Sequence, residues 1–214
     1  AVKVYDLNEG RVSRSLPGHR SNITSVHYHP FGEFVVSGSV DTNVKIWDIR
    51  KKVCIQTYKG HDLDITSARF SPDGRWVASA SKNGSFKLWD LTSGKLLNSW
   101  QLPPRVHMTN LCFNPSEFIL AACTTERVVR LYDMETFELM GSTTPESGAP
   151  VRAISFNPSG DVLLSATSDA CRAWVWEDHL VPPSSNQGGG DGIAGFGMMG
   201  AQQVVTPLAC STTV

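Results

Sequence analysis

The sequence predicts an all-β fold made of repeated four-stranded units, and two observations support this prediction. First, a short pattern of apolar, basic, apolar, aromatic and acidic residues returns along the chain, and its aromatic residues are spaced 42, 42, 43 and 42 residues apart. Second, short apolar runs separated by Gly, Pro, Asp and Ser lie between the copies, which is typical of strands joined by tight turns. The copies stand at Val2–Asp6, Val44–Asp48, Phe86–Asp90 and Val129–Asp133, with a weaker one at Cys171–Val175.

The unit that begins at Ser21 shows how one repeat is built. Turn residues at His29–Gly32 end its first apolar run, and Gly38–Asp41 ends its second. A fixed period of about 40–45 residues with this content is the signature of β-propeller blades, each of which is a four-stranded antiparallel sheet. The apolar runs of the unit fall at 23–28, 34–36, 44–47 and 53–58.

Counting such runs along the whole chain predicts an incomplete arc of about four blades. Ala1 already lies inside a strand pattern, so we expect the chain to begin within a longer protein. Open sheet edges of such an arc are prone to pair with other chains. The expected parts are two strands from 1–17, full blades at 21–60, 62–102 and 106–144, and three strands from 150–177.

Composition restricts the class of protein. The chain has 214 residues, of which 41% are hydrophobic and 18% charged, as in ordinary globular domains. A net charge of −1 does not favour a nucleic-acid binder. No apolar run is long enough to span a bilayer, and no secretory signal is apparent. The five cysteines form no C-x-x-C pair, and four lie in strand-like runs, which predicts buried free thiols in a cytoplasmic setting.

The repeats carry Gly-His near the start and Trp-Asp near the end, and in this they resemble the WD-repeat family. By that resemblance the first full unit contains a buried polar tetrad, in which the histidine bonds a strand hydroxyl, the acid holds the imidazole and the indole supplies a further donor. Buried polar groups are costly without partners, so four groups that satisfy one another can fix a loop against a strand. The tetrad residues are His19, Ser37, Asp41 and Trp47.

The later units keep the tetrad less completely. In the unit at 62–102 asparagine takes the place of the acid, which keeps an acceptor but loses the charge; its tetrad is His61, Ser79, Asn83 and Trp89. The third unit has Pro104, Ala122, Glu126 and Tyr132 at these positions, and the fourth keeps Ser165, Asp169 and Trp174. We therefore expect the first two full blades to be the most rigid.

Residues 178–214 are rich in Gly, Ser and Gln and have no repeat, which predicts a disordered tail after a propeller fragment at 1–177. The tail contains a Gly-x-Gly-x-x-Gly pattern at Gly195, Gly197 and Gly200. A dinucleotide site would also need a strand before these glycines, a helix after them and an acid downstream. None of these is indicated, so we predict a linker and no cofactor.

Three other patterns favour structural roles over chemistry. His27 and His29 could suggest a metal pair, but His29 stands at a turn position and His27 alternates with apolar neighbours in a strand, so we expect no metal. Ser, His and Asp of the tetrad could suggest a catalytic triad. The tetrad recurs in several units, however, and lacks the glycines of a nucleophile elbow, so we expect no catalytic residue and no enzyme. The basic cluster at Arg50–Lys52 is interpreted as a solvated loop.

Propeller geometry predicts where a partner would bind. Loops between strands four and one of successive units should meet the turns between strands two and three on one face. Polar and charged residues of these loops are the candidate contacts, namely Arg20, Asn22, Asp62, Asp64, Lys82 and Arg105.

Longer phrases carry a finer resemblance. The stretches His29–Lys52, Ser71–Leu97 and Arg130–Glu146 resemble the regulatory, non-catalytic WD-repeat subunit of katanin. The resemblance implies a protein of the cytoplasm and the microtubule cytoskeleton that targets and regulates microtubule severing, while a separate AAA ATPase subunit performs the chemistry. It implies that ATPase subunit and microtubules as partners. The helical domain that binds both in that family has no counterpart in this sequence.

Two alternatives of different kinds remain open. The chain could be a general WD-repeat adaptor unrelated to microtubules. It could also be an enzyme that uses the centre of the propeller, although no residue pattern favours this. Partner identification separates the first alternative from the katanin hypothesis, and an assay of nucleotide hydrolysis tests the second.

Overall fold

The computed structural model describes residues 1–143, 149–168 and 170–175. Within these residues the secondary structure consists of strands and turns without helices, and the strands form five antiparallel sheets. The prediction of an all-β fold of propeller blades is thus confirmed. The strands are β1 (Val2–Asp6), β2 (Arg11–Leu16), β3 (Ile23–Tyr28), β4 (Phe34–Ser39), β5 (Val44–Asp48), β6 (Val53–Tyr58), β7 (Ile65–Phe70), β8 (Trp76–Ser81), β9 (Ser85–Asp90), β10 (Leu96–Gln101), β11 (Met108–Phe113), β12 (Ile119–Thr124), β13 (Val129–Asp133), β14 (Leu139–Ser142), β15 (Ala153–Phe156), β16 (Val162–Ala166) and β17 (Cys171–Val175).

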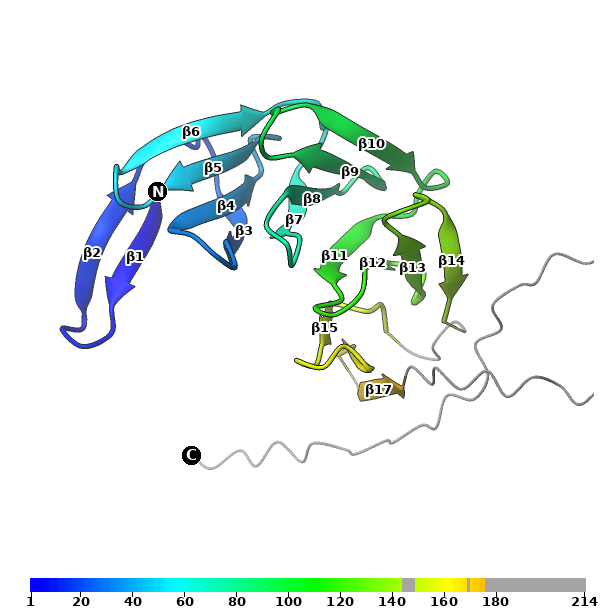
Figure 1. The fold of residues 1–214 in the computed structure, drawn as a ribbon. Coiled ribbons are helices and arrows are strands. Elements are labelled where there is room, and N and C mark those ends of the chain that lie inside the picture. Colours follow the sequence, from blue (N-terminus) through cyan, green and yellow to red (C-terminus); the bar gives the residue numbers. More distant parts are fainter. Residues whose placement is uncertain (144–148, 169, 176–214) are drawn as a thin grey trace, which may run out of the picture.

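Each sheet is one blade, and the blades follow one another along an arc (Figure 1). The first blade consists of β1–β2, the second of β3–β6, the third of β7–β10, the fourth of β11–β14 and the fifth of β15–β17. Within every blade each strand pairs with the next one in the sequence, as expected for short turns. The strands β3, β7, β11 and β15 lie on the concave side of the arc, and β6, β10 and β14 lie on its convex side (Figure 1).

The hydrophobic core lies between the blades, because each sheet packs its face against the next. Successive side chains of a strand point to opposite faces of the sheet. In β8, accordingly, Val77 packs toward the second blade, whereas Ala78 and Ala80 pack toward the fourth. In β5, Trp47 packs toward the first blade and Ile46 toward the third. The middle strands are therefore buried on both faces, which explains why they read as continuous apolar runs in the sequence.

The arrangement of strands also locates the two ends of every sheet. The loop that enters a blade before its first strand and the turn between its second and third strands lie at the same end, because neighbouring strands are antiparallel. The face formed by these loops is called the loop face below. The remaining two turns of each blade lie on the opposite face.

The structure tests the expectation that the cysteines in strand-like runs are buried. Cys123 is buried and Cys112 and Cys171 are half-buried, but Cys54 is exposed on β6, so the expectation that it is buried was wrong. It lies on the solvent side of an outer strand, where the apolar pattern of the sequence is misleading.

The predicted tail at 178–214 lies outside the described residues. No helix long and apolar enough to cross a membrane is found in the described part of the chain.

Close packing between blades generates a first prediction. Gly38 of β4 faces the third blade so closely that a methyl group there would lie 2.4 Å from Cγ2 of Ile65. Gly38→Ala should therefore lower the free energy of unfolding by about 1–3 kcal/mol, the usual cost of overpacking a core. Urea denaturation measures the change.

Gly141→Ala is the matched control, because nothing lies within 4 Å of the position that its methyl group would occupy. This variant should be as stable as the wild type or slightly more stable, since alanine restricts the unfolded chain. Equal stability of the two variants would contradict the packing between β4 and β7.

Candidate functional site

Four side chains of the second blade form a chain of hydrogen bonds. The Trp47 indole Nε1 donates to the Ser37 hydroxyl at 2.8 Å. The same Ser37 oxygen lies 2.7 Å from Nε2 of His19, and Nδ1 of His19 lies 2.9 Å from the Asp41 carboxylate. An indole can only donate, so Ser37 accepts from Trp47, and an ionised carboxylate can only accept, so His19 Nδ1 donates to Asp41. This set of four residues is called the first clamp.

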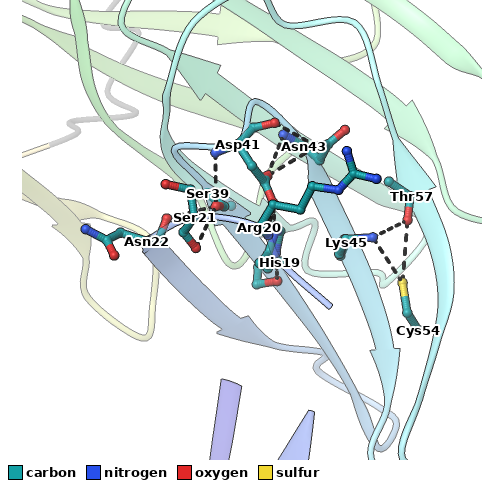
Figure 2. A network of polar contacts seen from close by, with 12 residues as sticks. His19, Arg20, Ser21, Asn22, Ser39, Asp41, Asn43, Lys45, Cys54 and Thr57 are labelled. Atoms are coloured by element: carbon teal, nitrogen blue, oxygen red, sulfur yellow. Dashed lines mark hydrogen bonds and ion pairs between the residues drawn. The ribbon is translucent and has the colours of Figure 1, made fainter. Parts of the chain in front are cut away.

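The first clamp joins two loops that are far apart in the sequence. His19 precedes β3, and Asp41 lies in the turn after β4. The backbone N–H of Arg20 also donates to the Asp41 carboxylate at 2.8 Å, and Asn43 N–H donates to its other oxygen at 3.1 Å (Figure 2). Desolvation raises the pKa of Asp41, but the hydrogen bonds from Arg20, His19 and Asn43 outweigh it and lower the pKa to about 2. Asp41 therefore stays ionised and holds the entering loop against the turn.

The third blade contains a second clamp with an additional member. Trp89 Nε1 donates to Ser79 at 2.8 Å, and Ser79 lies 2.7 Å from Nε2 of His61. The sequence suggested a direct contact between His61 and Asn83. Nδ1 of His61 instead lies 3.0 Å from the Ser85 hydroxyl. Ser85 in turn donates to the Asn83 side-chain oxygen at 2.6 Å.

Ser85 was not identified from the sequence, although a signal existed. Ser85 follows Asn83 by two residues, as Asn43 follows Asp41 in the second blade. A hydroxyl at this position can both accept from the histidine and donate to the amide oxygen, which bridges the gap left by the missing carboxylate. Burial lowers the pKa of His61 to about 4, with a smaller contribution from Lys87, while Asp62 acts in the opposite direction.

The remaining blades keep only parts of this arrangement. In the fourth blade Ala122 has no hydroxyl, and Tyr132 instead packs against Phe86 and Trp100, with ring centroids 4.8 and 5.9 Å away. In the fifth blade Trp174 Nε1 donates to Ser165 at 3.0 Å. Asp169, which the sequence places in the same tetrad, lies outside the described residues.

Burial decides what the clamps can do chemically. Ser37 is fully buried, and the side chains of His19 and Asp41 are only 1% and 7% exposed. A substrate would have to displace the loop to reach the serine hydroxyl. The arrangement is suited to fixing loops and unsuited to nucleophilic attack.

The histidines His27 and His29 also connect blades. His27 Nδ1 accepts from Phe70 N–H at 3.2 Å in the third blade, and His29 Nε2 lies 3.1 Å from the Gly74 carbonyl oxygen. Nδ1 of His29 accepts from Phe31 N–H at 3.1 Å, so both of its nitrogens are engaged. Burial, followed by the charges of Arg69 and His29, lowers the pKa of His27 to about 4. Within the described ranges no group of three or more His, Cys, Asp or Glu could hold a metal ion.

The other sequence patterns are placed as follows. Gly195, Gly197 and Gly200 lie outside the described residues. Arg50 lies 3.7 Å from Glu33 on the surface, and the backbone N–H of Lys51 donates to Asp48 at 2.9 Å. The basic cluster thus belongs to the turn after β5.

The six candidate contact residues all lie on loops of the loop face. Arg20 and Asn22 enter the second blade, Asp62 and Asp64 enter the third, and Lys82 follows β8. Five of the six, all except Asp64, are exposed. Lys82 and Asp64 form an ion pair of 2.6 Å, whereas Arg105 is a separate exposed residue on the loop before β11.

A cavity on the loop face was not predicted from the sequence. Its volume is about 380 Å³, and of the six candidate contact residues only Lys82 lines it. The cavity forms where loops of three blades meet, so no single repeat of the sequence contains it. Its lining residues are Thr66, Lys82, His107, Met108, Thr109, Thr125 and Arg152.

Comparison with known families agrees with this geometry. The chain matches the family model described as WD domain, G-beta repeat, at residues 10–48, 52–90 and 138–177, which together cover more than half of the chain. Each matched range begins in the outer strand of one blade and continues through the first three strands of the next. The unmatched stretch 91–137 contains β10–β13, which fold in the same way despite their altered tetrad. A search of curated proteins gave no match.

The first clamp generates a prediction about two aromatic residues. Trp47→Phe keeps an aromatic ring but removes the donor to Ser37, and loss of a partner by a buried polar group costs about 1–3 kcal/mol. Tyr132→Phe should cost less, because the Tyr132 hydroxyl makes no hydrogen bond to any residue that the structure describes. Urea denaturation of both variants gives the ranking. A larger loss for Tyr132→Phe would contradict the assignment of the clamp.

The lowered pKa of His61 predicts how stability depends on pH. The folded protein binds this proton only near pH 4, whereas the unfolded chain binds it near the ordinary pKa of 6.5. The stabilisation is therefore complete above pH 6.5 and is lost as the pH falls from 6.5 to 4, because the unfolded state takes up the proton first. His27 should act in the same direction.

Urea denaturation across this range measures the slope of stability against pH. In His61→Gln the slope should be shallower than in the wild type, with the part due to His27 remaining. An identical slope in the variant and the wild type would show that His61 does not titrate with folding.

Proposed function

Because the chain belongs to the WD-repeat family, we propose that it acts as a non-enzymatic scaffold that binds other proteins through the loop face. The observation that supports this most is the pair of clamps in the second and third blades. Each clamp ties an entering loop to a turn on the same face, through fully buried serines. A surface whose loops are already ordered loses less conformational entropy on binding.

The chemistry of the loop face supports a protein partner. Exposed charges of both signs stand on the loop face: Arg20 and Asp62 directly follow the clamp histidines, and Arg105 lies on the loop before β11. Such a mixture favours electrostatic selection of a partner surface. The serine and histidine groups, which could otherwise suggest catalysis, are buried inside the clamps.

We further propose, from the resemblance of the stretches His29–Lys52, Ser71–Leu97 and Arg130–Glu146, that the partners belong to a microtubule-severing assembly in the cytoplasm. In that assembly the AAA ATPase subunit would perform the chemistry, and this chain would take part in targeting. The support is the sequence resemblance alone, so the identity of the partner is a separate question from the use of the loop face.

Affinity capture from cytosol with the tagged chain tests both parts. Recovery of the severing ATPase or of microtubule-associated proteins supports the finer proposal. Capture of unrelated proteins through the loop face would indicate a general adaptor. Turnover of nucleotide by the purified chain would contradict a non-enzymatic role.

Charge reversal tests the loop face itself. Asp62→Lys combined with Asp64→Lys should abolish or strongly reduce capture of the partner, because it inverts two charges on the entering loop of the third blade and breaks the ion pair with Lys82. The readout is quantitative capture, with circular dichroism as the check of folding.

Glu117→Lys combined with Glu135→Lys is the matched control. It makes the same change in charge on exposed turns of the opposite face. Capture should be retained in this control. Equal capture by both double variants would remove Asp62 and Asp64 from the binding surface.

A further inference from the structure

The cavity on the loop face lies where the third, fourth and fifth blades meet. Thr66 and Lys82 come from the third blade, His107, Thr109 and Thr125 from the fourth, and Arg152 from the fifth. The strands β7, β11 and β15, which begin at this cavity, follow one another on the concave side of the arc (Figure 1). The volume of about 380 Å³ is enough for one or two side chains of a bound segment.

The two charged residues that line the cavity are both cationic. Lys82 and Arg152 line it, together with His107, and none of its lining residues is acidic. Asp64 neutralises part of the Lys82 charge through the ion pair of 2.6 Å. Arg152 is exposed, and its guanidinium makes no ion pair with any residue in the described ranges. Arg152 is therefore the cation best placed to meet an incoming anion.

Thr66, which lines the cavity, has a buried hydroxyl that makes no hydrogen bond to the residues that the structure describes. Thr24, Thr66 and Thr109 occupy the same bulged position near the start of β3, β7 and β11. Thr24 donates to the Ile65 carbonyl oxygen at 2.6 Å, and Thr109 donates to the Val151 carbonyl oxygen at 2.8 Å, so each bridges to the next blade. Thr66 makes no such bond, although its hydroxyl oxygen is buried. The Thr66 hydroxyl therefore lies beneath the surface of the cavity and does not contact a ligand there.

Of the other polar groups, Thr125 leaves a donor available. His107 donates from Nδ1 to the Lys82 carbonyl oxygen, and Nε2 of an imidazole with its proton on Nδ1 accepts, so His107 adds no donor here. The backbone N–H of His107 donates to the Thr125 hydroxyl oxygen at 3.1 Å, which leaves the Thr125 proton for another acceptor. The cavity thus combines the Arg152 guanidinium with the Thr125 hydroxyl, and both are groups that can donate to a carboxylate.

We propose that this cavity binds the carboxylate side chain of an acidic segment of a partner protein, with Arg152 as the principal contact. The inference rests on the proposed scaffold function and specifies the chemistry of one site on its loop face. A carboxylate fits because it can accept two parallel hydrogen bonds from the Arg152 guanidinium.

Fluorescence anisotropy with a labelled oligoglutamate peptide tests the proposal, and oligoglutamine and oligolysine peptides of the same length serve as controls. Oligoglutamate should bind, and its affinity should fall as salt is raised. Arg152→Glu should weaken its binding by about tenfold or more, as expected for loss of a charge-assisted contact. Arg127→Glu makes the same change on an exposed turn of the loop face outside the cavity, and it should have a much smaller effect.

If Arg152→Glu fails to fold, Arg152→Gln replaces it with the same expectation for binding. Unchanged binding to Arg152→Glu or to its replacement, an equal effect of Arg127→Glu, or equal binding of oligolysine would overturn the proposal.

The same Arg152 variant in the capture experiment distinguishes this inference from the proposed function. Partners that are captured equally by Arg152→Glu and by the wild type would reject the cavity while leaving the scaffold function in place. A loss of capture with Asp62 and Asp64 reversed, but not with Arg152 changed, has the same meaning.

Discussion

A single buried hydroxyl holds the loop face together in each complete clamp. The Ser37 oxygen accepts from an indole on β5 and bonds a histidine from the loop before β3, so one atom joins a strand to a loop. Its full burial makes every partner necessary, because an unsatisfied polar group inside the protein is costly. The charge of Asp41 completes the chain and fixes the tautomer of His19. These bonds tie the entering loop to the turn after β4.

The core supplies the complementary constraint. Each middle strand is buried on both faces, so a blade keeps its position only while its neighbours are present. Gly38 and Ile65 illustrate how close this contact is. The blades therefore behave as a series of neighbours, with stability distributed over their interfaces. Clamps then order the loops at one end of sheets that the core has already aligned.

The sequence predicted the blades because their period and turns are local features. It also predicted which residues gather in the clamps, since each clamp lies within one repeat. Ser85 was missed because its role depends on Asn83 being neutral, so that a hydroxyl is needed between the asparagine and His61. Thr66 and Arg152 could not be found in the sequence, because the cavity they share forms between blades. The exposure of Cys54 was likewise hidden, since outer strands carry apolar residues on a solvated face.

Amide hydrogen exchange at Arg20 tests most directly whether the clamp fixes the loop. Arg20 is exposed, so protection of its N–H depends on the 2.8 Å bond to Asp41. If the clamp fixes the loop, the Arg20 amide exchanges slowly in the wild type and fast in His19→Ala, while the amides of β5 remain protected in both. Exchange of Arg20 in the wild type at the rate of an unstructured peptide, or an unchanged rate in His19→Ala, would contradict this prediction.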